Sequence, residues 1–398
     1  MENKSTSDAV IQVIEDWSRA IDNKQSVSTV FFDFSKAFDM VNHEILLKKL
    51  EQHLPKWITS WIAIYLTNRR QRVKTANYTT KWYIVEAGVI QGSVLGPILY
   101  IIFLSDINNF IPANIKAPKY ADDIATYCIF NDPTENNIQL AVDGVSKWTE
   151  INQMKLNIKK TQAMHININE QTPITINNQE ITTTTSYKYL GTQLNTKLDW
   201  DSQWEFISKK FNSTLYLIKT LKNLAFKKEI LVSIYKSLVL SHIISNVITL
   251  CATTKRVKDE MEDMQKRFLK AIGLISSDLK HYKIVPIEEL IEKHGKQKLS
   301  KILLDNEHPI TKSLEKRESI TRKNFPFAIQ KCNGDKYQDS FLQQFLRKLE
   351  KEGFALPKTT ITTKPPKVAE NATCEICNKI FKNTRGVNQH KRMTHKNI

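Results

Sequence analysis

The chain is poor in glycine and proline, and it contains no long apolar run. Ten glycines and 12 prolines among 398 residues provide few turn and linker signals, so most of the chain is expected to be ordered. The longest apolar run, Val94 to Leu104, includes a Gly-Pro pair. It is too short to cross a membrane and predicts a buried helix. The polar, charged N-terminus lacks the pattern of a signal peptide.

Cysteine is also scarce, which excludes a disulfide-stabilised secreted domain. The chain has five cysteines, and only Cys374 and Cys377 lie close together in the sequence. Such scattered cysteines make no disulfide framework, so an intracellular protein is expected.

Negative charge is under-represented relative to positive charge. The 58 Lys and Arg residues exceed the 41 Asp and Glu residues by 58 − 41 = 17. This excess favours a polyanionic partner, nucleic acid before membrane, although a basic protein with a solvated lysine surface has the same composition. The hydrophobic content of 41% is ordinary for a globular protein, and the length allows two or three domains.

The pattern of elements changes along the chain. Up to Trp200, short strands and helices are mixed without the regular alternation of a doubly wound sheet. Apolar stripes with interspersed lysines then predict an almost entirely helical region, followed by a linker rich in proline and threonine. The boundaries that we expect are 1–198, 199–275, 276–354, 355–373 for the linker, and 374–395 for a small C-terminal unit.

Three aspartates lie at the ends of predicted strands. Asp33 lies near the end of a strand predicted over 27–34, and Asp122 and Asp123 lie in a predicted hairpin over 120–129. A carboxylate at the end of a buried strand must be paired, solvated or bound to metal. Mg²⁺ prefers carboxylate oxygens, and two such ions can stabilise a phosphoryl transfer. On these residues alone, simple turn or cap aspartates remain the alternative.

The order of five motifs resembles that of reverse transcriptases from non-LTR (LINE-like) retrotransposons. Their D-x-x-x-A-F-D, G-V-P-Q-G-S-x-L-G-P, [YF]-A-D-D, L-x-L-N-x-x-K-T and Y-L-G motifs are similar to residues 33–39, 88–97, 120–123, 154–161 and 189–191. Five matches in the family order far exceed a chance match. Ile90 departs from the family's proline.

The resemblance implies an α+β fold and a polymerase. The expected fold is a palm with an antiparallel sheet in a split βαβ arrangement, a helical thumb and tail, and a small ββα zinc finger. The implied activity is RNA-directed DNA synthesis from dNTPs with two Mg²⁺ ions, on an RNA template and a DNA primer or target. A nuclear location and no membrane association are expected, and the oligomeric state is left open.

The resemblance also implies roles for single residues. Asp33 and Asp122 would hold the two Mg²⁺ ions with support from Asp123, and the carbonyl of Phe34 would be a further ligand. Phe38 would be the steric gate that excludes a 2′-hydroxyl; the alternative is a core phenylalanine.

Further residues are implied around the nucleotide. Gln91, Gly92 and Ser93 resemble the loop that lies against the incoming nucleotide and template, and Ser93 is also expected to cap the next helix. Lys160 resembles the basic residue suggested to protonate pyrophosphate; the alternative is a solvated surface lysine. The Tyr189–Gly191 segment resembles the primer grip, and the lysine-rich helices after residue 200 resemble a thumb that contacts phosphates or, alternatively, form a solvated face.

The C-terminal residues have the spacing of a Cys2His2 zinc site. Cys374, Cys377, His390 and His395 would supply two thiolates and two imidazoles to one structural Zn²⁺. About 25 residues bury too little surface to fold without the metal. Its basic residues suit phosphate contacts, and a structural or protein-binding finger is the alternative, as is chance spacing in a disordered tail.

One departure from the family concerns activity. Only one helix precedes the strand that ends at Asp33, where family members have a fingers region that grips the triphosphate. We therefore keep two rivals to the active polymerase: a truncated, inactive nucleic-acid-binding relic, and a sequence-specific zinc-finger regulator.

Overall fold

The computed structural model describes residues 5–168, 173–315 and 325–354, together with the short segments 372–373 and 380–381. It divides into two compact units, Met1–Phe354 and Ala355–Ile398. Within the described residues no helix is both long and apolar enough to span a membrane.

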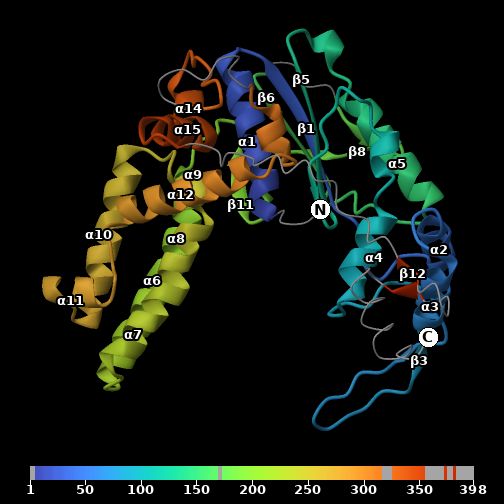
Figure 1. The fold of residues 1–398 in the computed structure, drawn as a ribbon, viewed down its shortest axis with the longest axis horizontal. Coiled ribbons are helices and arrows are strands. Elements are labelled where there is room, and N and C mark those ends of the chain that lie inside the picture. Colours follow the sequence, from blue (N-terminus) through green and yellow to red (C-terminus); the bar gives the residue numbers. More distant parts are fainter. Residues whose placement is uncertain (1–4, 169–172, 316–324, 355–371, 374–379, 382–398) are drawn as a thin grey trace, which may run out of the picture. The chain divides into compact units, whose positions relative to one another are not determined.

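A five-stranded sheet organises the first unit (Figure 1). Its strand order is β4-β5-β1-β6-β9, and the central strand β1 is antiparallel to both of its neighbours. Because β5 and β6 flank β1 and are connected through the helix α5, they form the expected split βαβ unit. One edge differs from the expectation of an antiparallel sheet, since β9 pairs with β6 in parallel. The strands are β4 (Lys119–Tyr120), β5 (Asp123–Phe130), β1 (Ser26–Phe32), β6 (Gln162–Ile166) and β9 (Thr182–Thr183).

Both faces of β1 are covered by helices, which explains why all of its residues after Ser26 are buried. Phe31 lies against Trp17 of α1 (Thr6–Asp22), with their ring centroids 6.4 Å apart. Val30 and Phe32 belong to the opposite cluster, which contains Trp148 of α5 (Ile138–Ile151). The strand alternates between these two faces, so its register is fixed by the two cores.

The helix α4 (Leu95–Phe103) corrects one expectation from the sequence. It buries Leu99, Tyr100 and Phe103, but Val94 just before it is 86% exposed and Ile101 is 55% exposed. The apolar run is therefore a half-buried helix with an apolar outer face. A run with apolar residues on all sides shows no hydrophobic periodicity, so the sequence could not tell which face is exposed.

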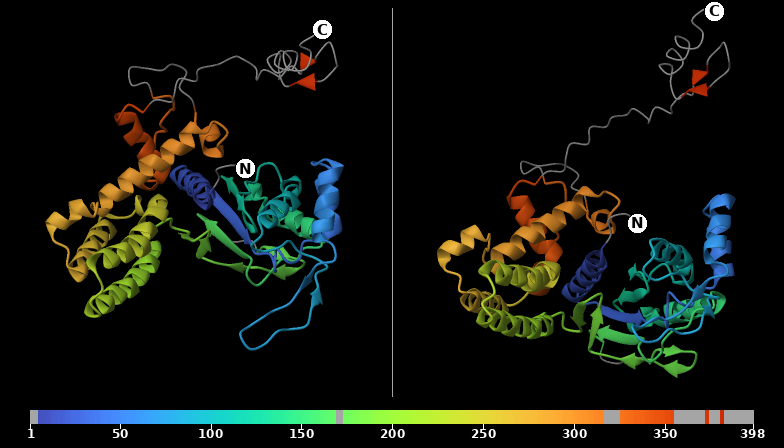
Figure 2. Two further views of the ribbon diagram at one scale, coloured as in Figure 1. Left: turned by 60° about the horizontal axis from the view of Figure 1, so that its bottom comes forward. Right: turned by 90° about the horizontal axis from the view of Figure 1, so that it is seen from below.

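The segment between the first two motifs forms two helices and a hairpin. The helix α3 buries Ile62 and Leu66, and the hairpin continues past its paired strands through the bridge between Lys74 and Thr79. The left view of Figure 2 shows that this hairpin projects away from the sheet. The elements are α2 (His43–Glu51), α3 (Lys56–Leu66), β2 (Arg70–Gln71) and β3 (Tyr83–Ile84).

After β6, two small hairpins lead into the helical region, as the lysine-rich apolar stripes predict. The short elements are η1 (Ile107–Phe110), η2 (Pro133–Glu135), β7 (Thr175–Ile176), β8 (Gln179–Glu180), β10 (Ser186–Tyr189) and β11 (Thr192–Asn195). The first helices are α6 (Asp201–Asn223), α7 (Lys228–Tyr235), the π-helix η3 (Lys236–Leu240), α8 (Ser241–Ser245), α9 (Val247–Leu250), α10 (Lys255–Ile272) and α11 (Ser276–His281). The last are α12 (Ile287–Leu304), α13 (Pro309–Ser313), α14 (Asp335–Gln338) and α15 (Phe341–Lys351).

The last helices of the first unit pack back on α1. The helices α14 and α15 both contact α1, and α15 also contacts α12. The Glu15 carboxylate accepts hydrogen bonds from the Leu342 backbone N–H and the Ser340 hydroxyl at the start of α15, at 2.7 and 2.8 Å. Residues far apart in the chain are thus joined by a side chain that satisfies an otherwise unpaired helix terminus.

Candidate active site

The three strand-end aspartates meet at one end of the sheet. Because Phe32 pairs with Ile124 in the β1–β5 register, Asp33 follows β1 at the level of Asp123. Tyr120 and Asp123 form the last pair of the β4–β5 hairpin, which leaves Ala121 and Asp122 in its turn. Residues that are far apart in the sequence therefore share one corner of the fold.

The charges of these carboxylates influence one another. Burial raises the pKa of Asp123, and the negative charges of Asp122 and Asp33 raise it further. A nearby cation would relieve this repulsion. Within the described ranges, however, no three His, Cys, Asp or Glu side chains already stand in an arrangement that could hold a metal ion. The structure thus brings the residues together without forming a complete coordination sphere.

The fourth motif fixes the backbone at Asp33. The Asn157 backbone N–H donates to the Asp33 carbonyl at 2.7 Å, and the Asp33 N–H donates to the Thr161 hydroxyl at 3.3 Å. Thr161 is fully buried. Lys160 itself is exposed, beside this turn. The motif therefore has a structural role at Asp33 that its sequence alone did not reveal.

Phe34 and Phe38 have different environments. The Phe34 side chain is buried edge-on against Trp148, with centroids 6.2 Å apart, so only its backbone can serve the site. The half-buried Phe38 ring stacks on Tyr100 of α4, with centroids 4.4 Å apart and an interplanar angle of 20°. Tyr100 therefore covers one face of the Phe38 ring and holds the ring in its orientation.

Tyr100 is a residue of the site that the sequence reasoning missed. Its side chain is fully buried, and its hydroxyl has no hydrogen-bond partner within the described residues. Burial raises the pKa of Tyr100 above its ordinary range, and the charges of Asp122 and Asp123 add to the effect. The available signal was its position as the single polar side chain in the apolar run Val94 to Leu104.

The loop after Gly88 depends on unusual backbone geometry. Gly88 has a φ of +94°, and a Cβ there would lie 2.8 Å from the Asp39 carbonyl oxygen. Only glycine allows this approach. The Gln91 side-chain amide donates to the Asp39 carboxylate at 3.3 Å, so this loop packs directly on the end of the first motif.

The end of this loop confirms the expected cap. The Ser93 hydroxyl accepts a hydrogen bond from the Gly96 N–H at 2.9 Å and donates to the Ile90 carbonyl at 2.8 Å. Gly92 has a φ of +81° and no atom within 4 Å of a hypothetical Cβ, so its backbone faces open space. A ligand could therefore approach the chain closely at Gly92.

The β10–β11 hairpin lies beside the carboxylates. Its turn residues Leu190 and Gly191 both have positive φ, the geometry that suits a two-residue hairpin turn. Tyr187 stacks on Phe31 of β1 with centroids 4.0 Å apart. Burial, followed by the charges of Asp123 and Asp33, raises the pKa of Tyr187 to about 12. Tyr187 is a second residue of this region that the motif comparison did not single out.

A cavity of about 310 Å³ adjoins the tip of this hairpin, where the start of α1 meets α6, α8 and α9. Lys188 and Lys210 both line it, and their ammonium groups lie 4.8 and 4.7 Å from the Phe206 ring. Two cations around one ring make this cavity attractive to an anionic, partly aromatic ligand.

Comparison with known proteins agrees with this geometry. Residues 1–194 match the family described as "Reverse transcriptase (RNA-dependent DNA polymerase)". The first 194 residues of the chain therefore resemble a reverse transcriptase domain.

The relatives come from insect mobile elements. The RNA-directed DNA polymerase from mobile element jockey of Drosophila melanogaster is 28% identical over 58% of this chain and 27% of its own length. The probable RNA-directed DNA polymerase from transposon BS of the same species is 27% identical over 55% of this chain and 26% of its own length. The chain thus spans about a quarter of these relatives.

Solved structures are more distant. Telomerase from Candida albicans in complex with a fragment of telomeric RNA is 14% identical over 74% of this chain and 51% of its own chain, with a TM-score of 0.36.

Proposed function

We propose that this chain is the polymerase part of a non-LTR retrotransposon protein, and that it adds dNTPs to a primer 3′-hydroxyl on an RNA template. The observation that carries the proposal is the meeting of Asp33, Asp122 and Asp123 at one corner of the sheet. A nuclear site of action belongs to the proposal, because the DNA target would be there.

The carboxylates supply the negative charge that two divalent ions require. Asp33 and Asp122 would hold the ions, while Asp123 and the Phe34 carbonyl complete their surroundings. When bound, the ions would lower the cost of charge on the attacking and leaving oxygens. The hydrogen bonds from Asn157 and to Thr161 hold Asp33 in place for this task.

The loop and the lysine assigned by resemblance belong to the same proposal. Gln91, Gly92 and Ser93 border the end of the first motif, where a nucleotide would lie against the exposed Gly92 backbone. Lys160 would supply a proton to the leaving pyrophosphate from the turn beside Asp33.

The helical region after residue 199 would act as the thumb. Lys188 and Lys210, at the cavity beside the β10–β11 hairpin, could neutralise phosphates of the primer strand. This surface would hold the duplex behind the reacting end without reading its sequence.

Primer extension tests the proposal directly. The full chain, an annealed DNA primer and RNA template, dNTPs and Mg²⁺ should yield extended primer, and chelation of Mg²⁺ should abolish the product. Retained binding without any extension would instead identify an inactive nucleic-acid-binding relic.

Substitution of Phe38 by Val tests its proposed role as the steric gate that excludes a 2′-hydroxyl. The ring rests on Tyr100, so its loss opens space beside the sugar, and we expect discrimination between dNTP and rNTP to fall by about tenfold to 100-fold. The measurement is single-nucleotide incorporation with each substrate. Phe110→Val, at another half-buried phenylalanine, should leave the ratio unchanged. An unchanged ratio in Phe38→Val would assign that ring to the core alone.

We also propose a structural zinc site in the second unit, with Cys374, Cys377, His390 and His395 as ligands. These four lie outside the described residues. Support comes from the strands β12 (Ala372–Thr373) and β13 (Ile380–Phe381), which pair antiparallel as the hairpin of a ββα finger would.

Metal analysis of the purified full chain tests this site. We expect about one zinc per chain, and its loss in Cys374→Ser, because a structural site needs all four ligands. Cys332→Ser is the matched control, since Cys332 lies in the first unit, where its sulfur accepts a hydrogen bond from the Arg347 guanidinium. Equal zinc content in Cys374→Ser and the parent chain would refute the site.

A further inference from the structure

The segment that contains α3 and the β2–β3 hairpin has an unusual composition. We call residues 56–84 the aromatic-basic arm. From Gln52 to Val85 the chain has no Asp or Glu and six basic residues, Lys56, Arg69, Arg70, Arg72, Lys74 and Lys81. The arm therefore forms a positive surface without internal neutralisation, which suits a polyanion.

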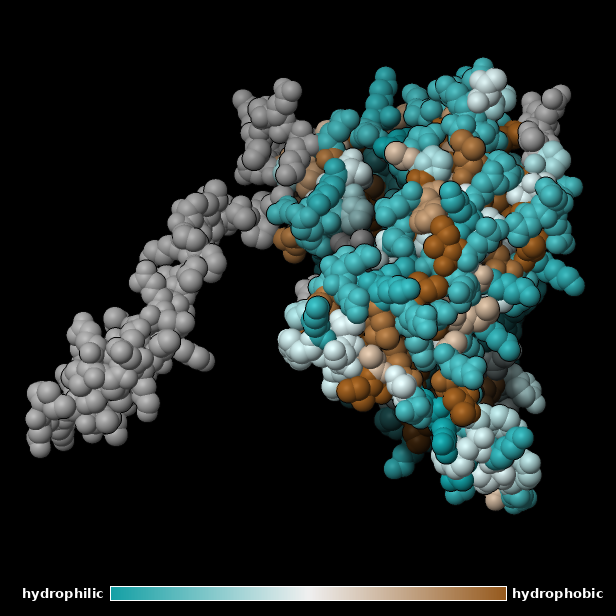
Figure 3. All heavy atoms as spheres, turned by 90° about the vertical axis from the view of Figure 1, so that its right-hand side faces the viewer, coloured by the Kyte–Doolittle hydropathy of each residue, from teal (hydrophilic) through white to brown (hydrophobic). Residues whose placement is uncertain are grey.

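The same arm exposes large rings that most folds would bury. Trp57 is 73% exposed, Trp61 and Trp82 are each 54% exposed, and Tyr78 and Tyr83 are 68% and 51% exposed. Three of the chain's seven tryptophans lie here. Figure 3 shows apolar patches broken by hydrophilic side chains on the side of the first unit that contains this arm. Clustered exposed rings indicate a binding surface more often than an accident of folding.

Cations and rings alternate along the arm. The Arg72 guanidinium lies 4.3 Å from the Trp82 ring centroid, and the Lys81 ammonium lies 5.5 Å from that of Tyr83. At the end of α3, Trp61 stacks near Tyr65 with centroids 5.9 Å apart. Trp61, Trp82 and Tyr83 therefore each have a positive group or a second ring beside them, while more than half of each side chain stays open to solvent.

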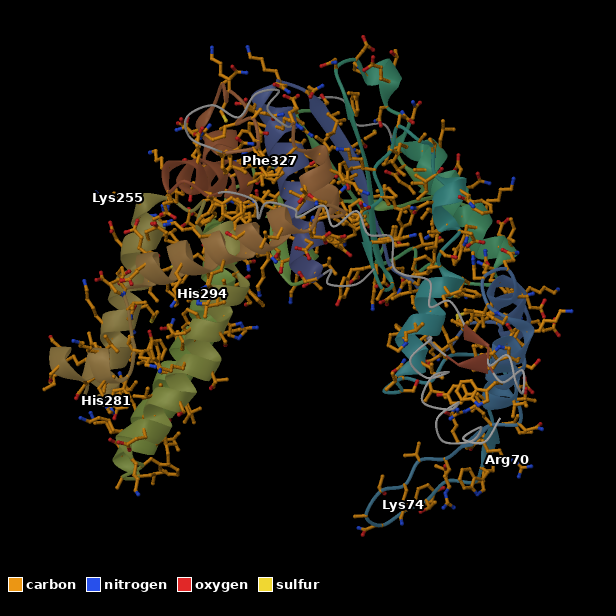
Figure 4. All side chains as sticks on the ribbon, viewed as in Figure 1. Arg70, Lys74, Lys255, His281, His294 and Phe327 are labelled. Atoms are coloured by element: carbon orange, nitrogen blue, oxygen red, sulfur yellow. The ribbon has the colours of Figure 1, made fainter. Side chains whose placement is uncertain are left out.

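The fold of the arm does not depend on these rings. Ile62 and Leu66 anchor α3 in the core, and backbone hydrogen bonds hold the hairpin, including one from Thr75 N–H to the Tyr78 carbonyl at 2.8 Å. Figure 4 shows Arg70 at the base of the projecting hairpin and Lys74 near its tip. The exposed rings and cations are therefore available to a ligand.

We propose that the aromatic-basic arm binds single-stranded nucleic acid, with bases stacked on its rings and phosphates held by its Arg and Lys side chains. A duplex hides its base faces and cannot use the rings, whereas a single strand can use both kinds of group. A membrane surface or a protein partner would use the same residues without this preference for unpaired bases. Within the proposed function, the bound strand is the RNA template before it is copied.

The test measures binding of a short fluorescent single-stranded RNA to the full chain without Mg²⁺ or dNTPs. Trp82→Ala should weaken binding of the single strand by about tenfold, the effect of losing one stacked base. The affinity for the same RNA in a duplex should be equal in Trp82→Ala and the parent chain. Arg72→Gln with Lys74→Gln should also lower the dependence of log affinity on log salt by about 0.7 for each phosphate that the variant no longer neutralises.

Leu140→Ala and Lys147→Ala, both exposed on α5, are matched controls that should bind as the parent chain does. Circular dichroism would establish that the arm variants are folded. Unchanged single-strand binding by folded Trp82→Ala and by the double charge variant would overturn the inference, as would equal losses for single strand and duplex, or a loss of binding to anionic vesicles instead of RNA. Because no catalysis is measured, a failed primer extension would refute the proposed function and leave this inference intact.

Discussion

Substitution of Asp122 by Asn is expected to lower primer extension by about 10³-fold or more, while RNA binding stays close to that of the parent chain. The substitution keeps the size of the side chain and removes one of three charges that meet at the β4–β5 turn and the end of β1. A site that holds two divalent ions loses both affinity and geometry when one ligand charge is removed. Single-turnover extension over a range of Mg²⁺ concentrations would measure the loss.

Asp263→Asn is the matched control for this experiment. Asp263 is 71% exposed on α10, where it pairs with Lys266, and its replacement should leave extension unchanged. If Asp122→Asn extended a primer as well as the parent chain, the carboxylates would not be the metal site. The polymerase mechanism proposed for this chain would then be wrong.

A companion change in pKa would support the same arrangement. Because Asp122 contributes to the raised pKa of Asp123, its neutralisation should let the Asp123 pKa fall toward its ordinary value. The expected consequence is a carboxyl resonance of Asp123 that titrates at lower pH in Asp122→Asn than in the parent chain.

The sequence predicted the site well where local chemistry determines it. An apolar segment runs up to Asp33 and another begins just after the Asp122 turn, so each carboxylate could be placed at a strand end. Their proximity follows from the pairing of β1 with β5, in which Phe32 lies opposite Ile124. That register depends on which faces are buried by α1 and α5, which no local pattern specifies.

Residues that act through packing were harder to predict. Tyr100 lies in an apolar run, and only the three-dimensional structure shows its ring under Phe38. Thr161 was recognised as part of a motif, but its hydrogen bond with the Asp33 backbone crosses 128 positions of sequence. The outer face of α4 was wrongly expected to be buried, because hydrophobicity alone does not tell which side of a helix has a neighbour.

The role of residues 276–354 was open in the sequence, and Glu15 shows how this region is attached to α1. Glu15 is 8% exposed and accepts hydrogen bonds from Leu342 N–H and the Ser340 hydroxyl. Burial raises its pKa from 4.5 to about 7, against the opposing effect of these hydrogen bonds. The folded chain therefore binds a proton more tightly at Glu15 than the unfolded chain does.

The raised pKa of Glu15 determines how the stability of the chain depends on pH. Because the folded pKa is raised, the stability contributed by proton binding is fully present below about pH 4.5 and is lost as the pH rises through about 7. The loss is ~3 kcal/mol in the free energy of unfolding at about 1.4 kcal/mol per pKa unit. Glu15→Gln cannot titrate, so its stability relative to the parent chain should improve by that amount between pH 4.5 and pH 8.

Urea unfolding of both chains across this pH window, followed by tryptophan fluorescence, would measure the difference. The Gln side chain can still accept from Leu342 N–H and donate to the Ser340 hydroxyl, so the packing of α15 should persist. Glu15→Ala also cannot titrate but removes both bonds, so it should be about 2 kcal/mol less stable than Glu15→Gln at every pH, since it leaves a buried N–H without a partner. Parallel pH profiles for the parent chain and Glu15→Gln would show that Glu15 does not change its protonation in this window. The attachment of the C-terminal helices to α1 would then be independent of pH.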